Sequence, residues 1–336
     1  MINYWNHRSD KKYSLLTKIA QLHSFLPADN ICRVEGKIVK VADKIIWLSY
    51  FALAAVTPLV FSTQNSELFE VPKMHFVYLL ATIIFFSTLI KVSLGGKILV
   101  PKSLPLAAFS IFFLFQIFST LTSIDKFTSV FGYPTRLNGG LLSQASYFVI
   151  LACAFMNLNP SRAKKLLMTI VITALAVALW GIPGHFGRDP SCLILTGKLT
   201  STCWQKEFDP QLRIFSTLGQ PNWLASYLVI VLPLSVAFAL INIRQLPKVL
   251  FGTTTLILFT ALVMTNSRAG FLGGAIALIL FLIFWLQAPA WRQTGFESVK
   301  QNIKVLITLG LGFSLITAVF GTTLISRIGE AISRSQ

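Results

Sequence analysis

Four polar residues stand at the edges of long apolar stretches and carry side chains suited to binding an anion. They lie in three stretches, with Arg136 in "SVFGYPTRLNGGLLSQ", Arg213 and Asn222 in "RIFSTLGQPNWLA", and Arg268 in "MTNSRAGFLGG". A guanidinium binds phosphate oxygens in a bidentate manner and stays charged when it is partly desolvated. Backbone N–H groups at a helix start also favour an anion. We therefore expect the three arginines to bind one anion, for which a diphosphate is the natural candidate.

Arg268 gives the strongest of these signals, because its turn has only a few residues and both flanking stretches are strongly apolar. Its side chain must lie at or just inside a membrane surface, where a lone charge is costly unless it is paired or solvated. The small residues of the following Ala-Gly-Phe-Leu-Gly-Gly allow another backbone or a ligand to approach closely. Arg268 is therefore the first candidate for contact with the anion.

Each of these residues also has an ordinary structural interpretation. The arginines can extend to lipid headgroups, or they can pair with an acidic residue such as Asp189, Glu207 or Asp209. Asn222 follows a proline and can cap the helix that begins there, whereas its functional role would be a hydrogen bond to a sugar or phosphate oxygen. His185 is either a base or an interfacial histidine.

The elements that position these residues are membrane spans. The 336 residues are 54% hydrophobic and 12% charged, with a mean hydropathy of +0.69, whereas soluble domains carry about 25% charged residues. Apolar runs recur that are long enough to cross a hydrocarbon core of ~30 Å. We predict an all-α, polytopic integral membrane bundle of about nine transmembrane helices. They lie near residues 45–62, 74–95, 103–122, 141–157, 166–185, 221–243, 249–266, 270–287 and 305–324.

Lysines and arginines are divided unevenly between the two sides of these spans. Ten of the 29 fall on one side: Lys73, Lys126, Arg136, Arg188, Lys198, Lys206, Arg213, Arg268, Arg327 and Arg334. The other 19 fall on the N-terminal side, which the positive-inside rule assigns to the cytoplasm. The net charge of +17 is explained by this bias, and we predict no nucleic-acid partner because no basic groove with interleaved aromatic residues is present.

The first 44 residues precede the first span and are basic. They are predicted either to form an interfacial helix, with Leu15, Ile19 and Leu22 on one face, or to be a partly disordered tail. Such a segment would have membrane lipids as its partner, through the anionic inner leaflet.

Two of the four cysteines share the longest external loop. Cys192 and Cys203 lie eleven positions apart, and they can form a disulfide if that side is oxidising. The alternative is two free thiols. No CxxC pair or histidine cluster has the spacing of a metal site, so we predict no metal and no cofactor.

Four stretches together resemble the O-antigen ligase and O-antigen polymerase family of bacterial membrane proteins. They are "TPLVFSTQNSELFEVPK", "FGYPTRLNGGL", "RIFSTLGQPNWLASYLVIVLPL" and "TNSRAGFLGG". The resemblance covers most of the chain from about residue 45 onward, and the last two stretches are the most specific. It implies a GT-C-like glycosyltransferase in the inner (plasma) membrane, whose active face is periplasmic or extracellular.

This resemblance also implies the substrates and the roles of the candidate residues. The donor would be a glycan on undecaprenyl diphosphate, and the acceptor would be lipid A-core, a growing polysaccharide or a protein. Arg268 matches the arginine of the family's Ser-Arg turn and would have the catalytic role of compensating the leaving diphosphate, without a metal. Arg213, Asn222 and Arg136 would bind or position the substrate.

One departure from the family concerns the region after the last span. The family carries a large external loop there, with a further arginine and a histidine proposed as the general base, whereas this sequence stops at "ISRIGEAISRSQ". We therefore expect residues 325–336 to be the start of that loop in a longer protein. Two other function classes remain open, a transporter or flippase of lipid-linked glycans and a non-catalytic membrane scaffold.

Overall fold

The computed structural model describes residues 28–64, 67–95, 103–205, 208–241, 244–287 and 295–322. These residues form a helical bundle, as expected, and contain no β-strand. The helices are α2 (Ala28–Ala55), α3 (Glu70–Gly95), α4 (Leu104–Thr122), α5 (Lys126–Phe131), α6 (Leu141–Asn157), α7 (Pro160–His185), α8 (Pro190–Thr196), the 3-10 turn η2 (Ser216–Leu218), α9 (Pro221–Ile241), α10 (Gln245–Met264), α11 (Arg268–Gln287) and α13 (Gly295–Phe320).

Seven of the described helices are long and apolar enough to cross a membrane. The helix surfaces support the same conclusion, because large apolar side chains on α4, α11 and α13 are exposed rather than packed inside the protein. Faces of this kind require an apolar solvent. The chain is therefore a multi-pass membrane protein of the all-α class. The expected interfacial helix up to residue 27 and the expected loop segment 325–336 lie outside the described residues.

Two of the nine expected spans are not among these seven helices. The span expected at 141–157 is the helix α6, which is shorter than the others at 17 residues. The span expected at 45–62 is the second half of α2, which begins upstream of the expected boundary at residue 44 and ends at Ala55. The chain turns soon after Ala55, since the residue before Pro58 is disfavoured in the helical region.

Several helices begin earlier than their apolar cores. The helix α7 begins at Pro160 rather than near residue 166, because Asn159 caps it by accepting a hydrogen bond from the Arg162 N–H at 2.8 Å. The first turns of α7 and α10 are polar, so hydropathy alone places their starts too late.

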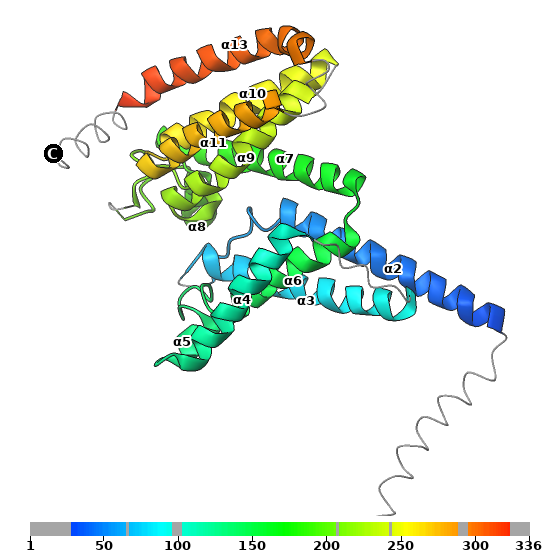
Figure 1. Ribbon diagram of the computed structural model, residues 1–336. Coiled ribbons are helices and arrows are strands. Elements are labelled where there is room, and N and C mark those ends of the chain that lie inside the picture. Colours follow the sequence, from blue (N-terminus) through cyan, green and yellow to red (C-terminus); the bar gives the residue numbers. More distant parts are fainter. Residues whose placement is uncertain are drawn as a thin grey trace, which may run out of the picture.

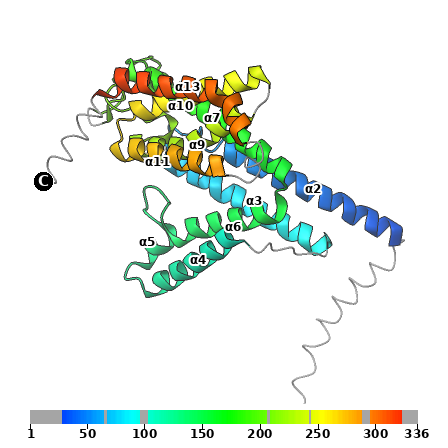
Figure 2. The same cartoon turned by 45° about the horizontal axis from the view of Figure 1, so that its top comes forward.

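The described bundle has two halves (Figure 1). One half contains α2 to α6, and the other contains α7 to α13; α2 packs against α7 where the halves meet. The larger core lies among α7, α9 and α10 and is formed by fully buried residues such as Val177, Leu228 and Leu262. A smaller core joins α2, α3 and α6 around Ile46 and Ile84. Figure 2 shows α4 and α5 projecting beside α6, away from the larger core.

A charged network ties four helices together at one end of the molecule. Asp43 of α2 forms ion pairs with Lys91 of α3 and Arg162 of α7. The Lys91 ammonium also donates to the Asn157 side chain of α6 at 3.1 Å. Hydrogen bonding from Arg162, helped by Lys91, lowers the pKa of Asp43 to about 2.

We expect Asp43→Asn to lower the apparent melting temperature of the detergent-solubilised protein by about 2–4 °C at pH 7. The folded-state pKa lies below the usual carboxyl value, so the stabilisation is present at neutral pH and is lost as the pH falls from about 4 towards 2. The matched control is Glu35→Gln on the same helix, since Glu35 has no ion pair with the described residues. Equal melting temperatures for the two variants would contradict this role of Asp43.

Candidate functional site

Four connections between helices meet at the end of the molecule opposite the Asp43 network; we call this the site end. Their described residues are 56–64 and 67–69, 132–140, 186–205 and 208–220, and 265–267; the third connection contains α8 and η2. The Lys73 ammonium at the start of α3 donates to the carbonyl oxygens of Val60 and Thr217, each at 2.6 Å. The backbone N–H of Ile214 donates to the Met264 carbonyl at 3.1 Å. These contacts join segments that are far apart in the sequence.

Lys73 is the centre of this assembly. Its ammonium makes a third hydrogen bond, at 3.2 Å, to the carbonyl of Phe69. The Phe69 ring in turn lies against Gly219, where a Cβ would come within 2.6 Å of it. Gly219 has a φ of +80° as well, so only glycine suits both the turn and the close contact. The "LGQPN" turn is therefore fixed just ahead of α9.

Arg213 and Asn222 are hydrogen-bonded to each other. The Arg213 guanidinium donates to the Asn222 side-chain oxygen at 2.9 Å and to the Thr265 carbonyl at 3.1 Å. The same Asn222 oxygen accepts a hydrogen bond from the Ser267 hydroxyl at 3.0 Å. One amide oxygen thus links the connection before α9 to the turn between α10 and α11.

Arg268 follows this network by one residue. Ser267 caps α11 by accepting a hydrogen bond from the Gly270 N–H at 3.2 Å, and α11 begins at Arg268. The Arg268 side chain is exposed and makes no hydrogen bond or ion pair within the described part of the chain. Among the glycines that follow, Gly270 lies directly against Ala225 of α9: a Cβ added at Gly270 would come within 2.5 Å of the Ala225 side chain. The close approach expected there is made by a neighbouring helix.

Arg136 reaches the same region from another connection. Its guanidinium lies over the ring of Trp223, at 5.1 Å from the ring centroid, and pairs with Glu70 at 3.3 Å. Trp223 follows Asn222 directly in α9. The side chain of Arg136 is 46% exposed, while that of Glu70 is 15% exposed. Arg136 is thus held in place and still reaches solvent.

The turn before Arg268 has unusual geometry. Asn266 adopts a φ of +50°, which is uncommon for a residue other than glycine, although asparagine tolerates it. Its side-chain oxygen is buried and has no hydrogen-bond partner within the described residues. Orphaned buried acceptors are rare in folded proteins and often mark functional positions.

Two cavities open at the site end. A cavity of about 140 Å³ lies beside the Arg213–Asn222 pair, and its wall also includes Asp209, Phe215 and Gln220. A wider recess of about 490 Å³ lies between the first connection and α3. Its lining residues are Val60, Ser62, Pro72, His75, Phe76 and Leu79.

The longest connection is closed by a disulfide between Cys192 and Cys203. Asp189 braces it further, because its carboxylate accepts hydrogen bonds from the Trp204 indole at 2.7 Å and from the Ser191 N–H at 2.8 Å. Asp189 therefore helps to hold the loop. His185 packs edge-on against Phe186 and Phe320.

The structure thus brings all four sequence candidates to one end, linked through Trp223 and Ser267. Asn222 is the second residue of α9 rather than its cap, since α9 begins at Pro221. Of the acids considered as partners, Glu207 lies outside the described residues, and Arg136 instead pairs with Glu70. Sequence reasoning missed Trp223, Ser267 and Glu70 as parts of the site, because only the fold brings them there.

We expect Lys73→Met to lower the apparent melting temperature by about 5 °C. The Lys73 side chain is half-buried, and its loss leaves three carbonyl groups without their charged hydrogen-bond donor. Differential scanning fluorimetry on the detergent-solubilised protein measures this shift. Lys126→Met is the matched control, because Lys126 is an exposed residue near the same end whose ammonium makes no hydrogen bond or ion pair among the described residues. If both variants had the melting temperature of the wild type, Lys73 would not hold the connections together.

Peptide mapping without reduction should recover Cys192 and Cys203 in one cross-linked species, while Cys153 is alkylated only after unfolding. Cys153 is buried and unpaired. The measurement is mass spectrometry of protein alkylated before and after denaturation. Recovery of Cys192 and Cys203 as separately alkylated peptides would rule out the bridge.

No metal-binding group of three or more histidine, cysteine or acidic side chains occurs within the described ranges. Comparisons of the chain with known protein families, with curated proteins and with solved structures found no match. The case for a function therefore rests on the residues gathered at the site end.

Proposed function

We propose that the chain is a membrane glycosyltransferase of the O-antigen ligase and polymerase type, which transfers a glycan from undecaprenyl diphosphate to an acceptor hydroxyl. The observation that carries this proposal is the convergence of Arg136, Arg213 and Arg268 at one end of a membrane bundle. The type of reaction is inferred from the motif resemblance, and the role of each residue is inferred from its contacts at the site end.

The electrostatics of the site end favour an anionic ligand. Arg136 has an acidic partner in Glu70, while Arg213 is bonded by neutral oxygens from Asn222 and Thr265 in addition to its other contacts. Arg268 is exposed and has no protein partner among the described residues. A diphosphate carries enough charge to engage several guanidinium groups at once.

Arg268 is assigned to the phosphate that leaves with the lipid. As the glycosidic bond breaks, negative charge builds up on the diphosphate oxygen, and a fixed cation stabilises it without reorganisation. The N-terminus of α11 adds to the positive potential at this point. Ser267 and Asn222 hold the start of α11 against the Arg213 segment, so they position Arg268 rather than react.

The reaction compartment follows from two features. The disulfide between Cys192 and Cys203 lies in the longest connection at the site end, and disulfides persist in oxidising compartments. The lysine and arginine bias of the sequence also assigns this end to the side away from the cytoplasm. We therefore propose that transfer takes place on the outer face of the plasma membrane.

The placement of charge disfavours the flippase alternative. A carrier of lipid-linked glycans needs polar or charged groups along a path through the bundle. In the seven described helices that are long and apolar enough to span a membrane, the lysines, arginines and acidic residues lie instead towards the ends of the spans, as at Lys73, Lys91, Arg162 and Lys248.

In the full-length protein we expect Arg268→Ala to reduce glycan transfer by a factor of about 100 or more, with expression unchanged. Arg268→Lys should retain part of the activity, since the charge remains but the bidentate geometry is lost. The assay follows transfer from undecaprenyl-diphosphate glycan to lipid A-core, polysaccharide or protein acceptors in the presence of a metal chelator.

The matched control is Arg188→Ala, because Arg188 is an exposed arginine of the same end whose side chain makes no hydrogen bond or ion pair within the described chain. It should transfer glycan at the wild-type rate. Wild-type activity of Arg268→Ala would remove the diphosphate assignment. Failure of the wild type to transfer to any acceptor, together with passage of lipid-linked glycan across vesicle bilayers, would favour the flippase instead.

A further inference from the structure

A separate cavity lies between α10 and α13, at the end of the bundle opposite the site end. Its volume is about 200 Å³. The residues that line it are Gln245, Lys248, Val249, Gly252, Thr253, Leu256, Lys304, Val305, Thr308 and Leu309. These residues recur at intervals of three or four along both helices, so one face of α10 and one face of α13 form the two walls.

The cavity is closed at both ends by contacts between the same two helices. At the polar end, the buried Lys248 ammonium donates to the Asn302 side-chain oxygen at 2.8 Å. At the apolar end, Leu256 packs so tightly on Gly312 that a Cβ there would come within 2.5 Å of it. Between these contacts, a Cβ at Gly252 would meet nothing within 4 Å. The helices touch at two places and leave a groove between them.

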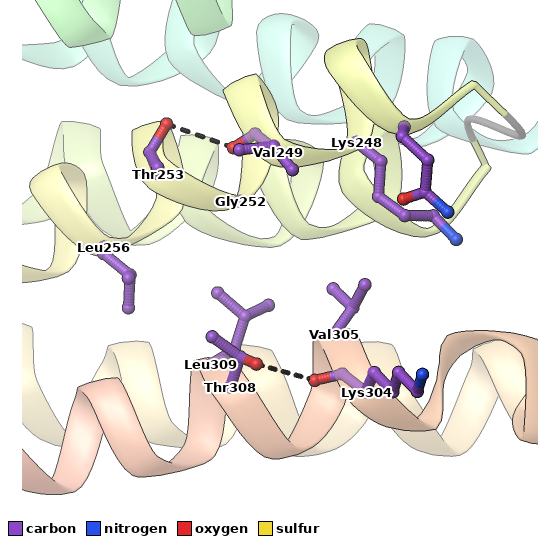
Figure 3. A pocket seen from close by; sticks show the side chains of 10 residues that line it. Lys248, Val249, Gly252, Thr253, Leu256, Lys304, Val305, Thr308 and Leu309 are labelled. Atoms are coloured by element: carbon purple, nitrogen blue, oxygen red, sulfur yellow. Dashed lines mark hydrogen bonds between the residues drawn. The ribbon is translucent and has the colours of Figure 1, made fainter.

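The groove is polarised along its length. Figure 3 shows Lys248 and Lys304 together at one end and Leu256 towards the other. Lys304 is exposed, and its ammonium makes no hydrogen bond or ion pair within the described part of the chain. From Lys248 to Leu256 the groove extends about 12 Å along α10, at 1.5 Å per helical residue. That is the length of the upper part of an acyl chain.

Charge and position together identify the occupant. The two lysines lie near the ends of two candidate membrane spans, Gln245–Met264 and Asn302–Phe320, where lipid phosphates meet the hydrocarbon region, and the groove below them is apolar. Arg244 precedes α10, is exposed, and adds a third cation at this end beside the exposed Lys304 and the buried Lys248. We propose that the groove between α10 and α13 is a binding site for an anionic phospholipid, with its phosphate at Lys304 and Lys248 and one acyl chain along Gly252. This site is independent of the proposed glycan transfer.

Native mass spectrometry of the detergent-solubilised chain tests this with phosphatidylglycerol and phosphatidylcholine of identical acyl chains. The wild type should retain phosphatidylglycerol with about fivefold preference, the contribution expected of a lysine near the phosphate. Lys304→Gln should reduce phosphatidylglycerol binding to the phosphatidylcholine level. Gly252→Phe should reduce the binding of both lipids, because the ring fills the groove.

Two control variants separate the site from general effects. Gly310→Phe adds the same ring to α13 outside the groove, at a position where a Cβ also meets nothing within 4 Å. Lys165→Gln removes an exposed lysine from the start of α7. Both should bind lipid as the wild type does.

Three results would overturn the proposal. The first is equal retention of the two lipids by the wild type, and the second is wild-type lipid binding by Gly252→Phe. The third is displacement of phosphatidylglycerol by millimolar inorganic phosphate, which would identify an anion site without a lipid chain.

Discussion

The hydrogen bonds of one ammonium group organise the end of the bundle that carries the candidate site. Lys73 donates to the carbonyl groups of Val60 and Phe69 in the first connection and of Thr217 in the turn before α9. A cation near a membrane boundary is stable only when its donors are satisfied, and here backbone carbonyls supply the partners. The connection that carries Arg213 and the start of α9 that carries Asn222 are thereby held against the half that carries Arg136. This constraint adds to the contacts of Arg136 with Trp223 and of Arg213 with Asn222, which hold the arginines near one another.

Neutral groups also help to hold the site together. Asn222 uses a single oxygen to join Arg213 and Ser267, and an aromatic ring supports Arg136. These contacts fix the positions of the side chains, and Arg268 has no acidic partner among the described residues. A preorganised cluster of this kind costs little reorganisation when an anion binds. The opposite end contrasts with this, because the Asp43 carboxylate there forms ion pairs with both Lys91 and Arg162.

Much of the fold could be predicted from the sequence because hydropathy and length determine which segments cross a membrane. The candidates Arg136, Arg213, Asn222 and Arg268 were visible as polar residues at the edges of apolar runs. The contacts that join them were not, because Trp223 and Ser267 are ordinary helix-start residues until tertiary packing brings them beside arginines. A helix start that lies in a polar first turn, such as the start of α7 at Pro160, cannot be located by hydropathy either. The groove between α10 and α13 depends on how two helices cross, which no local pattern encodes.

The most direct test of the account is the affinity of the full-length protein for undecaprenyl diphosphate, compared with undecaprenol, in the presence of a metal chelator. We predict that the diphosphate binds at least about tenfold more tightly, a difference of about 1.4 kcal/mol, and that Arg268→Ala abolishes the difference while Arg188→Ala preserves it. Equal affinity of the wild type for the two lipids would contradict the central claim that the arginines at the site end form a diphosphate-binding site.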